Sequence, residues 1–398
     1  YVTRQCLFRY LDDFCERPKP SLEFSKLIDL AAKQEERCAE TMNQAAESYF
    51  KSFFEKSGKS IINTAFSQKE GGRQNGVIIT ITYKNEPAAE THKISYFVKT
   101  HQNGSQIKSG CGKQEVELKE LFFYKVLEHL GLGPKTHFIF RPEIGDEFLI
   151  ATQDTAFTKA STRKKVFSTL WQIDNAEEKT LNDKAQKTIL LIFLLQSMFH
   201  VEDIHAQNVG RVTVSGDVET REKWKVVDFR ISEGPWYLLD ISPGNFQFPQ
   251  TLVERDPVES KIWQSMDDQR KVALAIELLQ EFSAGFPCRS REGNKKSLAQ
   301  ALDAALCEVY RLVLQYPEEV NIFPQGSFGE ALRGSHTDED LLAIAALDKY
   351  CDKERSWEMR KIPCGDLIRY ARSVRKNFLD LLTSLQAKQS EFSVKSPL

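Results

Sequence analysis

HVEDIHAQN, residues 200–208, is the stretch of the sequence that decides the predicted fold. It holds Asp203, then His205, then Asn208. An Asp followed five residues later by Asn arises by chance about once in a chain of this length, and with His at the third place in about one chain of twenty. The stretch directly follows a long helical pattern over residues 182–198 and directly precedes a short strand pattern over residues 209–214. We therefore expect a polar loop of functional residues between a buried helix and a strand.

A second acid follows this loop at the end of an apolar strand pattern over residues 225–231. This acid is Asp228, and a strand-terminal Asp can also simply cap a turn. The next acid-terminated strand pattern, residues 236–241, offers Asp240 as an alternative. Asp228 is preferred because its distance from Asn208 leaves room for one hairpin, whereas Asp240 needs an additional hairpin.

The sequence before the loop predicts one compact mixed lobe. Strands are predicted over residues 61–70, 77–83, 93–100, 136–140 and 147–152, with a helix over 114–130. The first two strands flank the turn GGRQNG, residues 71–76, which predicts a glycine-rich hairpin. A helical pattern over residues 22–54 precedes this lobe.

Two charged residues of this lobe could meet across neighbouring elements. Alternation along the strand over 93–100 puts Lys99 on the face of Phe97, although a lone strand lysine is usually solvated. Glu117, Glu120 and Tyr124 share one face of the helix over 114–130. Glu120 is the better candidate partner for Lys99, because it lies among apolar residues, where a carboxylate needs a partner.

Helical patterns dominate beyond residue 156. Further helices are predicted over residues 267–283, 297–314, 339–350 and 365–386. We therefore expect an α+β protein with an N-terminal helical extension (residues 1–58), a small mixed-sheet lobe (59–155) and a mostly helical lobe (156–390).

Taken in order, these features resemble the protein-kinase-like superfamily, and most closely its aminoglycoside- and choline-kinase-like branch. That branch uses a loop of the form His-Gly-Asp-x-His-x-x-Asn, which this chain matches at Asp203, His205 and Asn208. ELFFYKVL, residues 120–127, followed by GLGP, residues 131–134, also resembles the helix and turn typical of these kinases. The resemblance covers about residues 60–285 and implies a two-lobed kinase-like fold.

The resemblance implies roles for ten candidate residues. It implies that Asp203 is the catalytic base toward a substrate hydroxyl and that Asn208 and Asp228 bind Mg²⁺. Lys99, supported by Glu120, is expected to hold the α- and β-phosphates of ATP. The glycine turn, with Gly71, Gly72 and Gly76, is expected to cover the phosphates. Residues 149–153 are expected to link the lobes, with Ile150 and Thr152 presenting backbone groups to adenine.

The chain also departs from the branch pattern. The first His of the branch falls at Val201 and is either absent or displaced to His200. Arg230 follows the Asp-Phe pair where protein kinases usually have Gly, and no Ala-Pro-Glu segment follows. These departures favour a kinase of a small molecule over a protein kinase. They also keep open a pseudokinase, a kinase-like module that binds nucleotide or protein partners and transfers nothing.

The acceptor is the least defined part of this prediction. Trp236, Trp263, Asp256, Glu259 and Asp267 suggest an aromatic and acidic pocket for a cationic acceptor, or else an ordinary helical core with a charged rim. A small-molecule acceptor is expected in either case. The N-terminal helical extension is a candidate surface for a protein partner.

Composition narrows the possible binding partners and the cellular compartment. The 398 residues are 41% hydrophobic and 28% charged, with a net charge of -2, so no global field would hold the protein on nucleic acid or on a membrane. Eight scattered cysteines without a Cys-x-x-Cys favour reduced thiols in the cytoplasm. Because the chain begins at Tyr1, we expect a fragment or a processed form.

Overall fold

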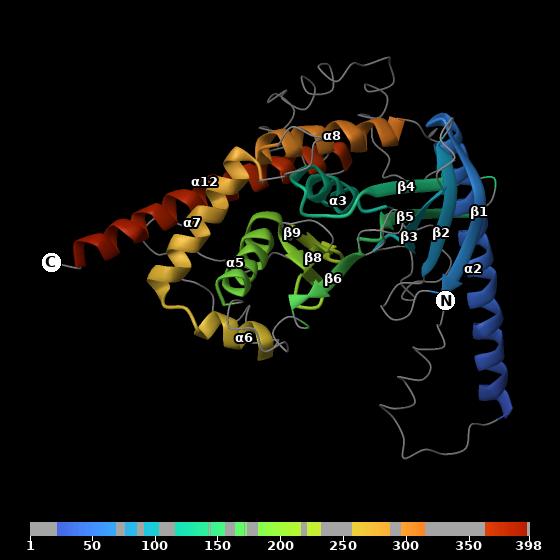
Figure 1. The fold of residues 1–398 in the computed structure, drawn as a ribbon, viewed down its shortest axis with the longest axis horizontal. Coiled ribbons are helices and arrows are strands. Elements are labelled where there is room, and N and C mark those ends of the chain that lie inside the picture. The colour runs from blue at the N-terminus through green and yellow to red at the C-terminus, as the bar shows by residue number, and fades with distance from the viewer. Residues whose placement is uncertain are drawn as a thin grey trace. The chain divides into compact units, whose positions relative to one another are not determined.

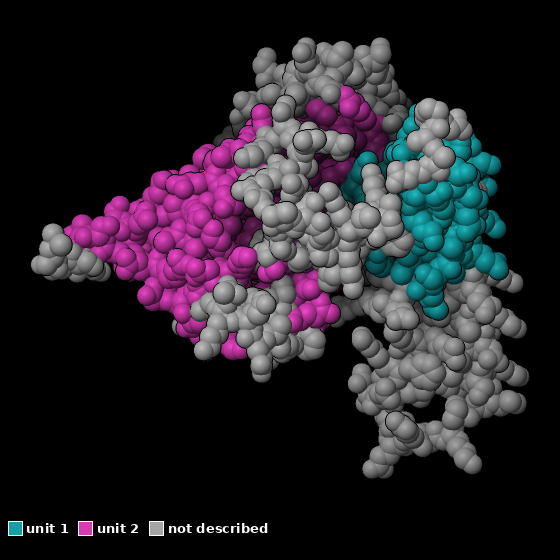
Figure 2. All heavy atoms as spheres, viewed as in Figure 1, with its two compact units in different colours: residues 1–117, 135–162, 320–322 teal, residues 118–134, 163–319, 323–398 magenta. Residues whose placement is uncertain are grey.

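The computed structural model in Figure 1 contains an antiparallel sheet, two smaller sheets and several long helices. It describes residues 22–68, 76–85, 91–102, 116–141, 143, 145–155, 164–170, 172, 182–215, 221–231, 257–286, 296–314 and 363–395. The chain divides into two compact units (Figure 2). Unit 1 comprises Tyr1–Glu117, Lys135–Thr162 and Val320–Ile322, and unit 2 comprises Leu118–Pro134, Arg163–Glu319 and Phe323–Leu398.

Unit 1 is built on a five-stranded antiparallel sheet of order β1-β2-β3-β5-β4. Its elements are α2 (Leu22–Lys56), β1 (Lys59–Gln68), β2 (Gly76–Asn85), β3 (Thr91–Thr100), β4 (Thr136–Arg141) and β5 (Gly145–Gln153). The antiparallel pairing of β1 with β2 confirms the predicted hairpin.

The core of unit 1 lies between one face of this sheet and the C-terminal half of α2. Strand β2 shows the alternation expected of a half-buried strand, since every second residue from Val77 to Tyr83 is buried. Residues of α2 join these side chains in one apolar cluster: Met42, Ala45, Ala46, Phe50 and Phe54. This face of the sheet is therefore closed by α2.

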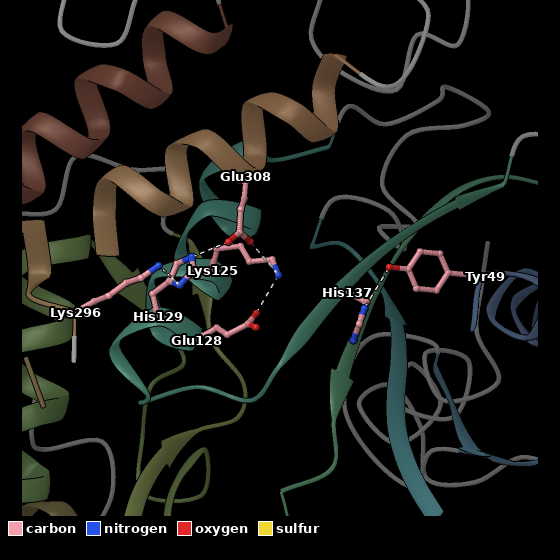
Figure 3. Close-up of polar contacts among 7 residues, drawn as sticks. All are labelled: Tyr49, Lys125, Glu128, His129, His137, Lys296 and Glu308. Atoms are coloured by element: carbon pink, nitrogen blue, oxygen red, sulfur yellow. Dashed lines mark hydrogen bonds and ion pairs between the residues drawn. The ribbon is translucent and has the colours of Figure 1, made fainter. Parts of the chain in front are cut away.

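An aromatic cluster on this face surrounds His137 of β4. The ring centroids of Tyr49, Phe50, Phe53 and Tyr96 lie 5.8, 5.4, 4.7 and 5.3 Å from that of His137. The hydroxyl of Tyr49 lies 3.2 Å from Nδ1 of His137 (Figure 3). The C-terminal half of α2 is thus part of the core of unit 1, whereas the sequence suggested an extension ahead of the lobe.

Unit 2 contains most of the helices. Its helices are α3 (Leu118–Leu130), α5 (Asn182–Phe199), α6 (Pro257–Gln264), α7 (Asp268–Ala284), α8 (Leu298–Leu314) and α12 (Pro363–Lys395). Its strands are β6 (Lys164–Thr169), β8 (Val209–Ser215) and β9 (Arg221–Val226), in a sheet of order β6-β8-β9, and the short pair β7 (Val201–Glu202) and β10 (Arg230–Ile231). Helix α5 is buried along most of its length and packs against α6, α7 and α12.

Charged residues join α3 to α8 (Figure 3). Nε2 of His129 lies 2.8 Å from Oε1 of Glu308, and Nζ of Lys125 lies 3.3 Å from Oε2 of the same carboxylate. Nζ of Lys296 lies 3.1 Å from Nδ1 of His129. Burial raises the pKa of Glu308, but the hydrogen bond from His129 and the charge of Lys125 outweigh burial and hold this pKa at about 2. An ionised Glu308 therefore helps to fix α3 on α8.

The described residues form a mixed α+β protein with a sheet-rich N-terminal part and a helix-rich C-terminal part, which confirms the predicted class at that level. Three elements were missed: β6, β7 and α6. The helix predicted over 114–130 begins at Leu118, and the strand predicted over 225–231 is divided between β9 and β10. The helix predicted over 339–350 lies outside the described residues. Among the described helices, none is long and apolar enough to cross a membrane.

Candidate active site

The loop between α5 and β8 is shaped by two residues with unusual backbone angles. His200 ends α5 with a φ of 50°, and Asp203 follows β7 with a φ of 57°. Both values lie in the left-handed region, which residues with a Cβ seldom adopt. Asp203 is exposed, so its carboxylate is accessible to a second molecule.

Asn208 closes the loop on Asp203. Its Nδ2 donates to the backbone oxygen of Asp203 over 2.7 Å and lies 3.2 Å from Nε2 of His205. Because the amide nitrogen is engaged inside the loop, the amide oxygen is the atom suited to a cation. Asn208 is therefore within hydrogen-bonding reach of the backbone of Asp203 and of the side chain of His205.

The backbone of the loop is anchored from two helices. Oε1 of Glu259 in α6 accepts a hydrogen bond from the backbone N–H of Ala206 over 2.6 Å. Nε2 of Gln196 in α5 donates to the backbone oxygen of Ile204 over 3.0 Å. Glu259 is only 6% exposed, so a carboxylate buried under the loop stabilises it from within.

Three of the residues suggested for an acceptor pocket have structural roles. Glu259 bonds the loop, as described, and Asp267 caps the N-terminus of α7 by accepting from the backbone N–H of Arg270 over 2.7 Å. Trp263 is a core residue whose ring lies 5.9 Å from that of Phe193. These three residues fit the ordinary helical core, and Trp236 and Asp256 lie outside the described residues.

Asp228 lies next to the same loop. The backbone N–H of Val227 donates to the backbone oxygen of Asn208 over 2.9 Å, which joins the segment before Asp228 to the end of the loop. The ring of Phe229 is buried and packs on α3, 4.6 Å from Phe123 and 4.4 Å from Tyr124. The structure thus brings the backbone segment that bears Asp228 next to Asn208, whereas Asp240 lies outside the described residues.

Glu120 lies in the first turn of α3 and is fully buried. The sequence placed it in the middle of a longer helix, and it placed Glu117 on the same face. Glu117 instead precedes the helix, so only Glu120 is held by helical geometry. A fully buried carboxylate at this point is costly unless it is paired or hydrogen-bonded, which distinguishes Glu120 from a surface glutamate.

Lys225, which the sequence did not single out, ties α3 to β9. Its Nζ donates to the backbone oxygens of Gly131 and Gly133 over 2.6 and 2.8 Å. The neighbouring backbone N–H of Val226 donates to the oxygen of Leu132 over 2.7 Å. A Cβ on Gly133 would lie 2.7 Å from Cβ of Leu127, so the glycine permits this close turn. The strand that leads to Asp228 is thereby attached to the helix that carries Glu120.

The predicted nucleotide residues of unit 1 form a row across three strands. Gly76 of β2 pairs with Lys99 of β3, which pairs with Ile150 of β5. Directly opposed residues share a face, and Lys99 lies on the face opposite to the one that α2 covers. Lys99 is 6% exposed, so it is not the solvated lysine of a typical strand.

The remaining predicted residue of unit 1, Thr152, pairs with Phe97 on the same face. Gly71 and Gly72 lie outside the described residues. The predicted site residues are therefore divided between the units: Lys99, Gly76, Ile150 and Thr152 belong to unit 1, and Glu120, Asp203, Asn208 and Asp228 belong to unit 2. The pairing of Lys99 with Glu120 stays a prediction.

The possible ligands near the loop suit a magnesium ion that is also bound by other molecules. Across the described ranges, no three His, Cys, Asp or Glu side chains group in a way that could hold a metal ion. One carboxylate, from Asp228, and one amide oxygen, from Asn208, are hard ligands that suit Mg²⁺ but do not complete its octahedral shell. Such a pair fits an ion whose other ligands are phosphate oxygens and water.

The chain matches no protein-family model, no curated protein and no solved structure.

Proposed function

We propose that this protein is an ATP- and magnesium-dependent phosphotransferase of the protein-kinase-like superfamily, acting on a hydroxyl group of a small molecule. The observation that carries the proposal is the 2.7 Å hydrogen bond from Asn208 to the backbone of Asp203. It joins two residues of the loop pattern, and a separate hydrogen bond from the N–H of Val227 to the oxygen of Asn208 joins the loop to the segment that bears Asp228.

The chemistry assigned to Asp203 is proton acceptance. Phosphoryl transfer passes through a loose transition state, so a catalyst contributes mainly position and electrostatic stabilisation. An exposed carboxylate held by a fixed backbone can orient the hydroxyl of an acceptor and take its proton as the oxygen attacks the γ-phosphorus. The bond from the γ-phosphorus to the leaving oxygen of ADP breaks in the same in-line displacement.

Asn208 and Asp228 would hold magnesium through their side-chain oxygens. The bound ion would supply positive charge against the β- and γ-phosphates as negative charge develops on the leaving group. The Nδ2 bond of Asn208 to the loop fixes which face of its amide is presented, and the packing of Phe229 on α3 restrains the backbone of Asp228. These contacts support the assignment of Asp228, and Asp240 lies outside the described residues.

For the nucleotide we assign Lys99 to the α- and β-phosphates. The burial of Lys99 supports the assignment, since a buried ammonium group requires a partner of opposite charge or strong hydrogen bonds. Ile150 and Thr152, on the strand paired with β3, are assigned to the adenine side through their backbone groups.

The experiment compares the parent protein with three acid variants in ATP binding and in slow ATP hydrolysis. Asp203→Asn should leave magnesium-dependent ATP binding nearly intact, because this carboxylate faces the acceptor, and should lower turnover on the order of 10²–10⁴-fold. Asp228→Ala should weaken both binding and turnover. Asp240→Ala should change neither.

Asp183→Asn provides a matched control, because Asp183 is a 79%-exposed acid at the opposite end of α5 from the loop. Equal effects of Asp203→Asn and Asp183→Asn on turnover would contradict the assigned base. A parent protein that binds ATP with magnesium but shows neither hydrolysis nor transfer to any compound of a metabolite set would replace the enzyme by a pseudokinase.

A further inference from the structure

The C-terminal helix α12 caps the end of α5. The last carbonyls of a helix have no partner within the helix and need donors from elsewhere. The hydroxyl of Tyr370 donates to the backbone oxygen of Phe199 over 2.5 Å, and Nδ2 of Asn377 donates to that of Met198 over 3.1 Å. Both donors lie on α12, at sequence separations of 171 and 179 residues from the carbonyls that they bind.

The same helix also reaches His200, the residue at which α5 ends. Nδ2 of Asn377 lies 3.0 Å from Nε2 of His200. Burial and the positive charge of Lys119 both lower the pKa of His200, so the imidazole is neutral at pH 7. A neutral imidazole with the proton on Nδ1 can accept the amide hydrogen of Asn377 at Nε2. The left-handed turn at His200 is therefore held by its side chain as well as by the helix end.

A short and rigid segment leads from His200 to Asp203. Val201 and Glu202 are the only residues between them, and both are paired with β10. Asp203 then turns the chain again through its φ of 57°. Because the two intervening residues are both restrained, a change in the backbone at His200 also changes the backbone at Asp203.

Tyr370 adds a contact to the helix that bears Glu120. Its ring lies 5.9 Å from that of Phe122, and Nζ of Lys119 lies 5.9 Å from its centroid. One residue of α12 thus touches α3 through its ring and the end of α5 through its hydroxyl. Helix α3 carries Glu120, and the loop that follows α5 carries Asp203 and Asn208.

We infer that α12 sets the position of the candidate catalytic loop, and that Tyr370 and Asn377 are positioning residues that act on Asp203 through the end of α5 and His200. The catalytic consequence rests on the proposed function. We call the contacts of Tyr370 and Asn377 with the end of α5 and with His200 the clamp. The clamp lies within unit 2 and can be measured without any reaction.

The experiment combines hydrogen exchange with kinetics on the full chain carrying Tyr370→Phe or Asn377→Ala. Tyr370→Phe keeps the ring on α3 and removes only the hydroxyl. Thr383→Val is the matched control, because among the described residues the hydroxyl of Thr383 bonds only to Leu379 of its own helix. Backbone amides of the loop serve as reporters, in particular those of Ala206, Asn208 and Val209.

Tyr370→Phe removes one supporting hydrogen bond and should speed exchange of these loop amides about tenfold, and Asn377→Ala, which removes two, should speed it at least as much. Neither variant should change exchange within α7. With an active parent, kcat should fall about 10- to 100-fold while KM for ATP stays within about twofold. The control should change neither quantity.

Loop exchange equal to that of the parent in both variants overturns the inference, whatever the activity of the parent. Faster exchange throughout unit 2 also overturns it, because the residues would then support only global stability. Faster loop exchange with an unchanged kcat overturns the positioning role. A parent without activity contradicts the proposed function instead and leaves the exchange measurement to decide the clamp.

Discussion

At the scale of single residues, the loop after α5 stores backbone strain at Asp203. A non-glycine residue in the left-handed region is disfavoured by about 1–3 kcal/mol and persists only where its surroundings over-determine it. The surroundings here are the Asn208 amide on one side and the β7-β10 pair on the other. Asp203, the proposed base, therefore presents an exposed carboxylate from a restrained backbone.

His101, which follows β3, predicts how the stability of unit 1 depends on pH. It is 4% exposed, and burial lowers its pKa from 6.5 to about 4. Because the folded pKa lies below the unfolded one, the unfolded chain takes up the proton first as the pH falls. Stability should therefore drop by about 2 kcal/mol from this residue between pH 7 and pH 5.

The measurement is urea unfolding at both pH values on the parent and on His101→Gln. The variant removes the titrating group, so its stability should fall by about 2 kcal/mol less than that of the parent over this interval. Glu308 does not interfere, since a carboxylate with a depressed pKa loses its contribution only below its unfolded pKa of 4.5. An identical pH dependence in the two proteins would contradict the buried neutral state of His101.

The local part of the candidate site could be predicted from the sequence. Asp203, His205 and Asn208 lie within one short loop, so their spacing alone brings them together. Glu259 and Asn377 could not be predicted to support this loop, because they lie 53 and 177 residues from the residues they contact. Such contacts are set by how α6 and α12 pack, and an isolated Glu or Asn carries no signal of it.

At the scale of elements, Lys225 tests whether the link between α3 and β9 matters. Lys225→Met keeps the aliphatic stem and removes two charge-assisted hydrogen bonds to glycine carbonyls. We expect a loss of about 2–3 kcal/mol in the free energy of unfolding.

The control for this variant is Lys376→Met on α12. Lys376 is 76% exposed, and within the described part of the chain it pairs only with Asp380 in the next turn of its helix, so the variant should lose less than about 0.5 kcal/mol. Chemical denaturation of both variants measures the difference. A Lys225→Met protein as stable as the Lys376→Met protein would show that the link contributes nothing.

Elements with a strong period could be read from the sequence, and short ones could not. The alternation along β2 and the long apolar run of α5 predicted both elements within a few residues. Strand β6 was missed because its six residues follow no clear alternation and depend on pairing with β8. The two-residue strands β7 and β10 are defined by their pairing with each other, so no local sequence pattern predicts them.

At the scale of the whole molecule, the residues proposed to bind nucleotide come from both units. Lys99 lies on a sheet face that α2 does not cover, and Asp228 lies between the loop and α3 in unit 2. A ligand that binds the folded chain and not the unfolded chain stabilises the folded state, so nucleotide binding can be measured through unfolding. Nucleotide binding is therefore the property on which the proposed function depends most.

The most direct test is thermal unfolding of the full chain with ATP, with Mg²⁺, and with both. Asp228 and Asn208 supply too few ligands for magnesium alone, so the ion should have little effect without nucleotide. ATP with magnesium at about a hundredfold excess over Kd should stabilise the protein by about 2.7 kcal/mol and raise Tm accordingly, and Asp228→Ala should remove most of this gain. No change in Tm at millimolar ATP with magnesium would contradict the account.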